Sequence, residues 1–300
     1  MSKRIALIGF GEAGRTFAGA GGWRESARAF DIIVQKCPDE PAMRAAFAAA
    51  GVTGCDTLEQ ALDGAQIILS LVTADQTASA AQDAAKALPA GALFCDLNSV
   101  SPGTKQRNAL AIEAAGARYV DVAVMSPVQP AALNAPLLVS GPHGDDAAAM
   151  LRSIGFTNVR ISGTEIGAAS ATKMVRSVMI KGIEALTAEM MLAAQAAGVT
   201  DAVLASLGGD WPAKVDYNLD RMLAHGLRRA AEMEEVVATL TELGIEPLMT
   251  RGTVERQRAL GGLLGGAPVP EGLDAKLVTI DKNGIDKSTK RRMQGKADAA

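Results

Sequence analysis

Short apolar runs alternate with alanine-rich stretches through the first half of the chain. The runs suit buried strands, and the stretches between them have the length of helical crossovers. Strands joined by such crossovers pair in parallel and need helices on both faces of the sheet. The pattern predicts a doubly wound α/β sheet. We expect strands at 5–8, 32–35, 67–72, 93–96, 119–124 and 137–140, and helices at 13–30, 41–50, 58–62, 78–88 and 104–115.

The alternation stops near Gly163, and apolar residues then recur at helical spacing. We expect helices at 165–197, 200–207, 217–243 and 247–264, without a strand among them. A helix from 165 to 197 would exceed about 40 Å, long enough to connect two domains or two subunits. The sequence therefore predicts an α/β, Rossmann-type dinucleotide-binding domain at 1–163, an all-α substrate and dimerisation domain at 164–280, and a polar tail at 281–300.

Composition excludes several classes of partner. A net charge of -3 and a pI near 5.6 give no electrostatic basis for binding nucleic acid or an anionic membrane. The three cysteines Cys37, Cys55 and Cys95 are widely spaced, so neither a metal site nor a disulfide framework is expected. Without a signal segment or a membrane-spanning run, we expect a cytoplasmic protein, with the basic residues of 282–296 in a solvated tail.

A glycine motif follows the first expected strand directly and precedes a helix. In G-x-G-x-x-G, the first glycine makes a tight turn, the second lets the backbone approach a pyrophosphate, and the third allows close packing of helix and strand. The free N–H groups at the helix start favour an anion. The motif predicts dinucleotide binding, although a glycine turn that only permits close packing is the alternative. Its residues are Gly9, Phe10, Gly11, Glu12, Ala13 and Gly14.

The end of the second strand indicates which nucleotide binds. A carboxylate there would bind the ribose hydroxyl of NAD. The expected strand at 32–35 ends in Gln35 and is followed by Lys36, which suits the 2′-phosphate of NADP better. NADP is therefore preferred over NAD, with an ordinary surface lysine as the alternative interpretation of Lys36.

Polar residues follow two further expected strands, at the edge where an open α/β sheet holds its ligand. Val72 and Thr73 end one strand, and Asn98 and Ser99 follow another. These residues are candidates to bind the cofactor or the substrate. Capping of the helix that starts near Pro102 is an equal alternative for this second segment, because a serine before proline suits an N-cap.

The order and spacing of four segments resemble the β-hydroxyacid dehydrogenase family, together with 6-phosphogluconate dehydrogenase. The segments are 9–14, 96–102, 121–126 and 167–177. The resemblance covers about residues 1–250. It implies an oxidoreductase that interconverts an alcohol of a hydroxy acid and its carbonyl with a nicotinamide cofactor. It also implies that Lys173 is the general acid/base and that Ser126, Pro127 and Ser177 contact the substrate.

Three departures from the family pattern affect the substrate site. Pro127 and Val128 stand where the family has two glycines, Ser177 stands for an asparagine, and Ala231 stands for a late lysine. The C-terminal half resembles a divergent branch of the family. The identity of the substrate therefore cannot be transferred from better-known members.

Lys173, Ser177 and Lys181 are four residues apart, so a helix would place them on one face. Desolvation and a second cation would both lower the pKa of an ammonium group there, which suits proton transfer. Spacing alone would leave Lys173 an exposed helix lysine; the family resemblance favours catalysis. Lys181 is a candidate to bind an anionic substrate, with a surface lysine as the alternative.

Two other functions remain open. Imine reductases share this architecture, but they usually place another residue where Lys173 stands. A non-catalytic NADP-binding sensor or scaffold would bind nucleotide without any need for Lys173. We also expect a homodimer, because a small helical domain with a long apolar helix buries itself poorly. Candidate partner contacts are Trp211, Tyr217, Met222 and the pair at 263–264.

Overall fold

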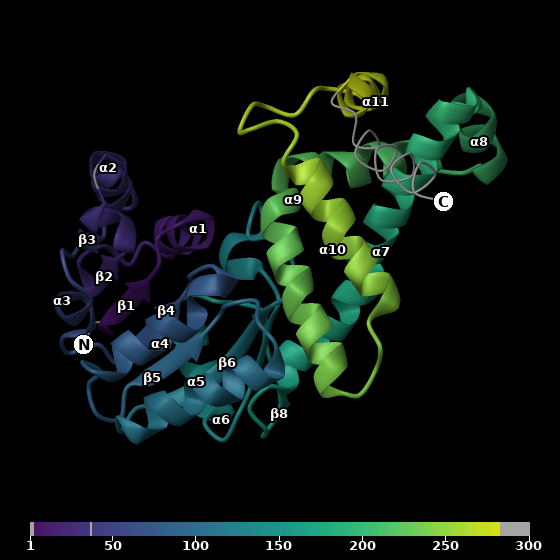
Figure 1. The fold of residues 1–300 in the computed structure, drawn as a ribbon. Helices are drawn as coiled ribbons and strands as arrows, with labels where there is room; N and C mark the ends of the chain where they lie inside the picture. Colours follow the sequence, from purple (N-terminus) through teal and green to yellow (C-terminus); the bar gives the residue numbers. More distant parts are fainter. Residues whose placement is uncertain (1–2, 37, 283–300) are drawn as a thin grey trace, which may run out of the picture. The chain divides into compact units, whose positions relative to one another are not determined.

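A computed structural model describes residues 3–36 and 38–282 of the chain. It confirms the predicted fold class, an α/β sheet domain followed by helices (Figure 1). The chain divides into two compact units, Met1–Val175 and Arg176–Ala300. The division falls inside a long helix and not at Gly163, because the first turns of that helix are bonded to the sheet unit. Most of the predicted tail, 283–300, lies outside the described residues.

The sheet of the first unit has eight strands in the order β3-β2-β1-β4-β5-β6-β7-β8. All neighbouring strands are parallel except β6 and β7, which are antiparallel. The strands are β1 Ile5–Ile8, β2 Ala27–Phe30, β3 Thr53–Gly54, β4 Ile67–Ser70, β5 Leu93–Asp96, β6 Arg118–Val124, β7 Leu137–Ser140 and β8 Val159–Gly163. The helices are α1 Glu12–Gly21, α2 Glu40–Ala50, α3 Leu58–Leu62, α4 Thr77–Ala85, α5 Pro102–Ala114 and α6 Gly144–Ser153.

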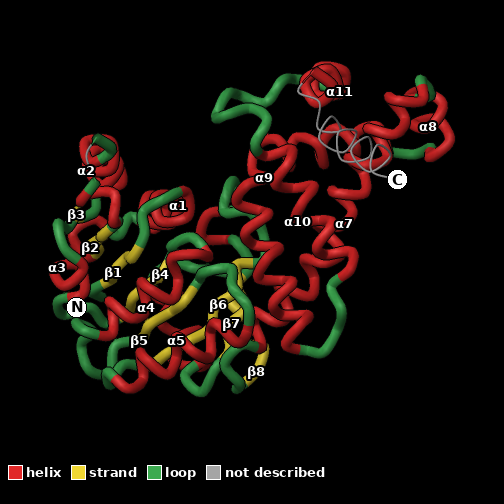
Figure 2. Tube along the Cα trace, viewed as in Figure 1, coloured by secondary structure: helices red, strands yellow, loops and turns green. Residues whose placement is uncertain are grey.

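Side chains of the strands alternate between two apolar cores, one on each face of the sheet. Ile5 and Leu7 join the core that includes α1, α2 and α6, whereas Ala6 and Ile8 join the core that includes α4 and α5. Figure 2 shows the strands with helices around them, as the continuous apolar runs predicted. This double coverage leaves the ends of the strands as the place where polar side chains gather.

The predicted second strand is wrong. Residues 32–35 form the 3-10 helix η2 (Ile32–Gln35), and β2 is the preceding segment, Ala27–Phe30. Asp31 accounts for the difference, because its side chain accepts a hydrogen bond from the Ile33 amide and starts the 3-10 turn. The predicted helix at 13–30 is correspondingly too long, since α1 ends at Gly21 and its C-cap Gly22 adopts a left-handed conformation with φ 57°.

Two edge strands were not predicted, for different reasons. β3 has only two residues. In β8, only Val159 is buried, so this strand lacks the continuous apolar run of the central ones. Edge strands with polar or exposed positions are common because they discourage pairing with other chains.

The described residues of the second unit form helices joined by loops and include no strand, as predicted. Its elements are most of α7 (Ala168–Ala197), then α8 Thr200–Leu207, α9 Trp211–Glu242, α10 Leu248–Gly261 and α11 Leu273–Lys282. Helices α9 and α10 approach closely at Gly226 and Gly261, where a Cβ atom on Gly226 would lie 2.7 Å from the Gly261 Cα. Among the described residues, no helix is both long enough and apolar enough to cross a membrane.

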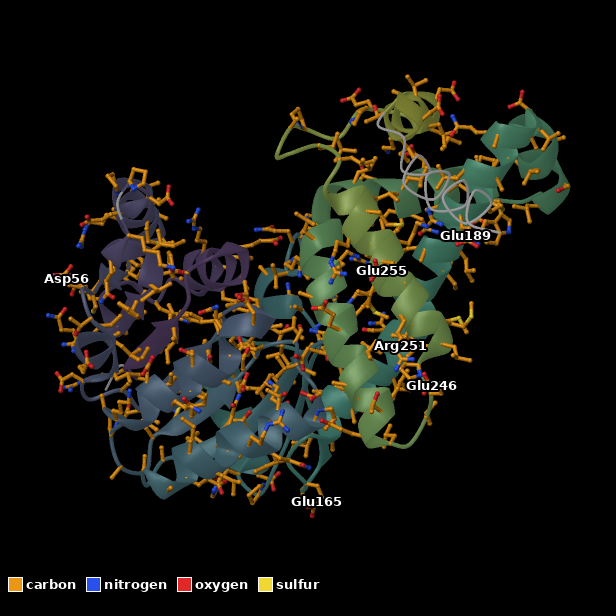
Figure 3. The ribbon with its side chains drawn as sticks, in the orientation of Figure 1. Asp56, Glu165, Glu189, Glu246, Arg251 and Glu255 are labelled. Carbon is orange, nitrogen blue, oxygen red and sulfur yellow. The ribbon has the colours of Figure 1, made fainter. Side chains whose placement is uncertain are left out.

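Most of the predicted partner contacts belong to the unit's own core, which corrects that expectation. Met222 is fully buried in this core, and Trp211 and residues 263–264 pack against it. Trp211 and residues 263–264 are only partly buried, and Tyr217 is 57% exposed. Exposed ion pairs lie on the surface of this unit. One joins Arg251 and Glu246, whose side chains lie close together in Figure 3.

Candidate active site

The predicted cofactor residues of the first unit gather at one edge of the sheet. Strands β1, β4, β5 and β6 are parallel, so their carboxyl ends share that edge. The chain runs from β1 to β2 on one side and returns to β4 on the other, which makes β1 and β4 the switch point where such sheets hold ligands. The turns at the four strand ends carry Gly9–Gly14, Val72–Thr73, Asn98–Ser99 and Ser126–Pro127.

The geometry at Gly9 and Gly14 agrees with the turn and packing roles that the motif predicted for them. Gly9 has φ 87°, and a Cβ atom on it would lie 2.7 Å from the carbonyl oxygen of Leu71 at the end of β4. A Cβ on Gly14 would lie 2.8 Å from the Gly9 carbonyl oxygen, so the helix packs tightly on the turn. A Cβ on Gly11 would meet no atom within 4 Å. Backbone is therefore accessible at Gly11, which fits a pyrophosphate.

The start of α1 directly follows this turn. Gly11 is the N-cap of α1 and has no side-chain capping bond, and the first N–H groups of a helix lack partners within the helix. Glu12 is exposed and Ala13 half-buried. Phe10 contributes differently, because its ring is fully buried against Phe47, with ring centroids 4.8 Å apart. The residues present thus fit a dinucleotide, with Phe10 acting as a core anchor for the turn.

Asp31 occupies the position that the sequence analysis assigned to Gln35 and Lys36. It follows β2 directly, and its Oδ2 accepts a hydrogen bond from the Phe10 amide at 2.7 Å. Gln35 and Lys36 are both exposed beyond the 3-10 turn, and Gln35 donates to the carbonyl oxygen of Asp56. NADP was therefore preferred because the second strand had been predicted at 32–35, whereas β2 ends at Phe30. A correct placement of β2 would have identified Asp31 from sequence.

The segment after β5 is held from several directions. Asn98 is buried, its amide donates to Asp96 Oδ1, and its Nδ2 donates to Ser70 Oγ at 2.9 Å. Its Oδ1 is buried and accepts no hydrogen bond from the described residues. Ser101 caps α5 by accepting a hydrogen bond from the Thr104 amide, as the capping interpretation predicted. An unpartnered acceptor at a strand end is what a hydroxyl-bearing ligand would satisfy.

Lys173 meets this segment within the first unit. Its Nζ donates a hydrogen bond to Ser99 Oγ at 2.6 Å. Lys173 lies near the start of α7, and Ser99 lies just beyond β5, so 74 residues separate the two in sequence. A lysine ammonium with a hydroxyl partner at the ligand edge of a dinucleotide-type sheet is placed to exchange a proton with a bound alcohol or carbonyl.

A buried polar network that was not predicted from the sequence supports both segments. Lys105 on α5 is fully buried; its Nζ donates to the Asp96 carbonyl at 2.6 Å and to Asp96 Oδ1 at 2.9 Å, and lies 3.4 Å from Asp121 Oδ1. We call this set the Lys105 cluster: Lys105, Asp96, Asn108, Tyr119, Asp121, Ser140 and Ser170. One signal existed, since Lys105 and Asn108 share the inward face of α5 with Ala109 and Ile112.

The raised pKa values of neighbouring groups reflect their burial away from water. Burial raises the pKa of Tyr119 well above its usual value, and the charges of Asp96 and Asp121 raise it further. The Tyr119 hydroxyl donates to Asp96 Oδ2 at 2.7 Å. Burial likewise raises the pKa of the Cys95 thiol to about 12. Charges in such surroundings persist only when they are paired and hydrogen-bonded, as Lys105 is.

The predicted substrate residues are divided between the two units. Ser126 follows β6, and its Oγ donates to the Pro127 carbonyl at 3.1 Å. Ser177 and Lys181 belong to the second unit, where Ser177 is buried. Lys181 Nζ donates to Glu232 Oε2 at 2.6 Å, so its charge has a partner within that unit. Among the described residues, no cluster of His, Cys, Asp and Glu could hold a metal ion.

The chain belongs to the family that carries the NAD binding domain of 6-phosphogluconate dehydrogenase, whose model matches residues 4–155. Residues 194–260 match a domain of unknown function, DUF1932. The first match confirms the predicted family and its dinucleotide-binding domain. The second lies in the half of the chain for which the sequence predicted a divergent branch.

Solved structures share the fold over nearly the whole chain. A conserved hypothetical protein from Sinorhizobium meliloti is 36% identical, covering 94% of this chain and 97% of that one, with a TM-score of 0.71. Mycobacterium tuberculosis 3-hydroxyisobutyrate dehydrogenase, solved with L-serine, is 17% identical, covering 94% and 99%, with a TM-score of 0.68. An Aspergillus terreus reductive aminase, solved with NADPH and ethyl levulinate, is 19% identical, covering 94% and 99%, with a TM-score of 0.56. The last two likenesses concern the fold alone.

Proposed function

We propose that the chain is an NAD(P)-dependent oxidoreductase that interconverts an alcohol of a hydroxy acid and its carbonyl, with Lys173 as general acid/base. The hydrogen bond of Lys173 Nζ to Ser99 Oγ, at the ligand edge of the dinucleotide-type sheet, carries this proposal. The family and the likeness to a 3-hydroxyisobutyrate dehydrogenase support the reaction class. The nicotinamide would supply the hydride chemistry, and the protein would supply position and a proton.

The residues of the first unit divide this work. The turn Gly9–Gly14 and the N-terminus of α1 would bind the pyrophosphate. Val72, Thr73 and Asn98 would contact the rest of the cofactor, because they lie at the ends of β4 and β5 beside that turn. The Gly9 backbone faces Val72, with a Cβ there only 3.1 Å from Val72 Cγ1.

Lys173 would move the proton, and Ser99 would hold its Nζ in place. In the oxidation direction a neutral Lys173 accepts the hydroxyl proton of the substrate, and in reduction its ammonium returns one. Ser126, Pro127, Ser177 and Lys181 are proposed substrate contacts. Of these, Lys181 already forms an ion pair with Glu232. It would therefore bind a substrate carboxylate more weakly than a lysine without an acidic partner.

The test is a screen of hydroxy acids with NAD+ and NADP+, run in parallel on wild type, Lys173→Ala and Lys86→Ala. Lys86 is an exposed lysine of the same unit, paired with Asp83, and serves as the matched control. We expect Lys173→Ala to lose about 10²-fold or more of kcat with nucleotide binding intact, and Lys86→Ala to retain activity. Undiminished turnover in Lys173→Ala would refute the acid/base role.

The screen also separates the two alternatives. Imine substrates with NADPH form a second panel, because a reductive aminase shares the fold. Turnover there, without turnover of any hydroxy acid, would make the chain an imine reductase. Tight nucleotide binding without turnover in either panel would make it a sensor or scaffold.

Asp31 supports NAD as the preferred cofactor, in place of the NADP inferred from Lys36. A carboxylate at the end of the second strand suits the ribose hydroxyls of NAD and repels a 2′-phosphate. Asp31→Asn should therefore improve the binding of NADPH relative to NADH, whereas Lys36→Ala should leave the ratio unchanged. Calorimetric titration of both nucleotides measures this; a ratio that responds only to Lys36→Ala would restore NADP.

A homodimer remains our proposal for the assembly. The second-unit part of α7 exposes Met179 (65%), Ile183 (39%) and Leu186 (54%), spaced on one helical face. A second copy of the chain would cover this apolar stripe. Sedimentation of wild type and a Met179→Glu, Leu186→Glu variant tests it: the variant should become monomeric, and a wild-type monomer would contradict the proposal.

A further inference from the structure

The first turn of α7 is held by the sheet and not by a capping residue of its own. Its amides at Ala169 and Ser170 donate to Ser140 Oγ at 3.0 Å and to Asp121 Oδ2 at 2.9 Å. Ser170 Oγ adds a 2.6 Å bond to Asp121 Oδ1. Asp121 and Ser140 are register partners of the antiparallel pair β6 and β7. A carboxylate at a helix N-terminus is favourable, because the helix dipole is positive there.

The same carboxylate is tied to the segment that carries Ser99. Asp121 Oδ1 lies 3.4 Å from Lys105 Nζ, which also donates to the Asp96 carbonyl and carboxylate. Asp96 Oδ1 in turn accepts the amide of Asn98, the residue before Ser99. One buried ammonium, with two buried carboxylates, thus connects the start of α7 with the turn after β5.

Lys173 lies one turn beyond Ser170, so the position of that turn decides where its side chain starts. We propose, building on the proposed function, that Asp121 is a positioning residue. Through Ser170 it fixes the first turn of α7 in the place from which Lys173 Nζ reaches Ser99 Oγ. Asp121 itself is fully buried, and its carboxylate accepts hydrogen bonds from the amide and hydroxyl of Ser170 and from the hydroxyl of Ser140.

This proposal differs from a purely structural role for the Lys105 cluster. A structural role predicts that weakening the cluster lowers stability and leaves the surroundings of Lys173 unchanged in the folded protein. A positioning role predicts that Lys173 itself responds. The variants are Ser170→Ala, which removes one hydroxyl, and Ser170→Thr, which restores it. Thr172→Ala is the matched control, because the Thr172 hydroxyl bonds only to the Ala168 carbonyl of the same helix and is exposed.

The experiment measures the rate at which trace acetic anhydride labels Lys173 across a pH series, using mass spectrometry on the full-length folded protein. It needs no substrate. In Ser170→Ala we expect the labelling rate of Lys173 to rise several-fold and its pH profile to shift, because the bond to Ser99 loosens. Lys86 should label at its wild-type rate. Thr172→Ala and Ser170→Thr should match wild type.

Activity gives a second readout once the screen provides a substrate. Ser170→Ala should then lower kcat by about tenfold with little change in KM, since even a misplacement of about 1 Å can cost about 10²-fold in rate. A wild-type labelling profile for Lys173 in a folded but less stable Ser170→Ala would overturn the proposal. If Ser170→Ala does not fold, Ser140→Ala, which removes the acceptor for the Ala169 amide, undergoes the same test. Failure of the proposed function would show elsewhere, as turnover retained in Lys173→Ala.

Discussion

Lys105 in the first unit and Lys181 in the second are both buried, yet they are satisfied differently. Lys105 has no exposed side-chain surface; a backbone carbonyl and two carboxylates surround it. Lys181 keeps 8% of its side chain exposed and pairs with Glu232, which also pairs with the exposed Arg228. Complete burial of a charge demands several fixed partners. The comparison indicates that the sheet unit surrounds a charge completely with polar partners, whereas the helical unit keeps one near solvent.

The largest effect should come from removing the first charge. Lys105→Met leaves Asp96 and Asp121 buried without their cation, so we expect the free energy of unfolding to fall by about 3–5 kcal/mol. Urea unfolding followed by circular dichroism measures it. Lys86→Met, at an exposed lysine, should cost no more than about 0.5 kcal/mol. A loss for Lys105→Met as small as that of the control would remove the difference between the two lysines.

An alkaline titration measures how dry the first region is. The Cys95 pKa is raised from 9.0 to about 12, so below pH 9 the thiol is neutral whether the chain is folded or unfolded. Above pH 9 only the unfolded thiol ionises, and stability should fall by up to about 1.4 kcal/mol per pH unit until the native pKa is reached. Cys95→Ala should lose less stability than wild type over this range. Parallel curves for the two proteins would show that the region admits water.

The smallest effect should come from Lys181→Met. Glu232 keeps Arg228 as a partner, so we expect a loss of only about 1 kcal/mol. The same urea measurement applies, with Arg228→Met as the companion variant. If Lys181→Met cost as much as Lys105→Met, the second unit would hold its charge as rigidly as the first, and the contrast would be wrong.

Part of the fold could be predicted because each central strand is a continuous apolar run. The run Ile67–Ser70 is one example, buried at every position. β2 was not predicted because Phe30 is the one large apolar residue of Ala27–Phe30. Ile32–Gln35, by contrast, has a composition typical of a strand. The carboxylate of Asp31 decided between them through two amide hydrogen bonds, one local and one to Phe10 in the glycine turn. The second of these bonds depends on tertiary packing.

The candidate site was predictable to a similar degree. The glycine motif has a local meaning, because a tight turn and a close helix require glycine wherever they occur. Lys173 could be singled out only through its family position, and the one signal for Lys105 was its place on the same helical face as Ala109 and Ile112. A lysine in the first turns of a helix is ordinarily solvated. Nothing local in the sequence shows that carboxylates from β5 and β6 will surround this one.

The sequence by itself determined the class of fold and the nucleotide turn, because periodicity and glycine geometry act over neighbouring residues; it singled out Lys173 only through its family position. Only the tertiary structure decided that Asp31 ends the second strand, that Lys105 is buried, and that Lys173 meets Ser99 across 74 residues of chain. Those outcomes depend on the register of parallel strands and on which polar groups must find partners once water is excluded.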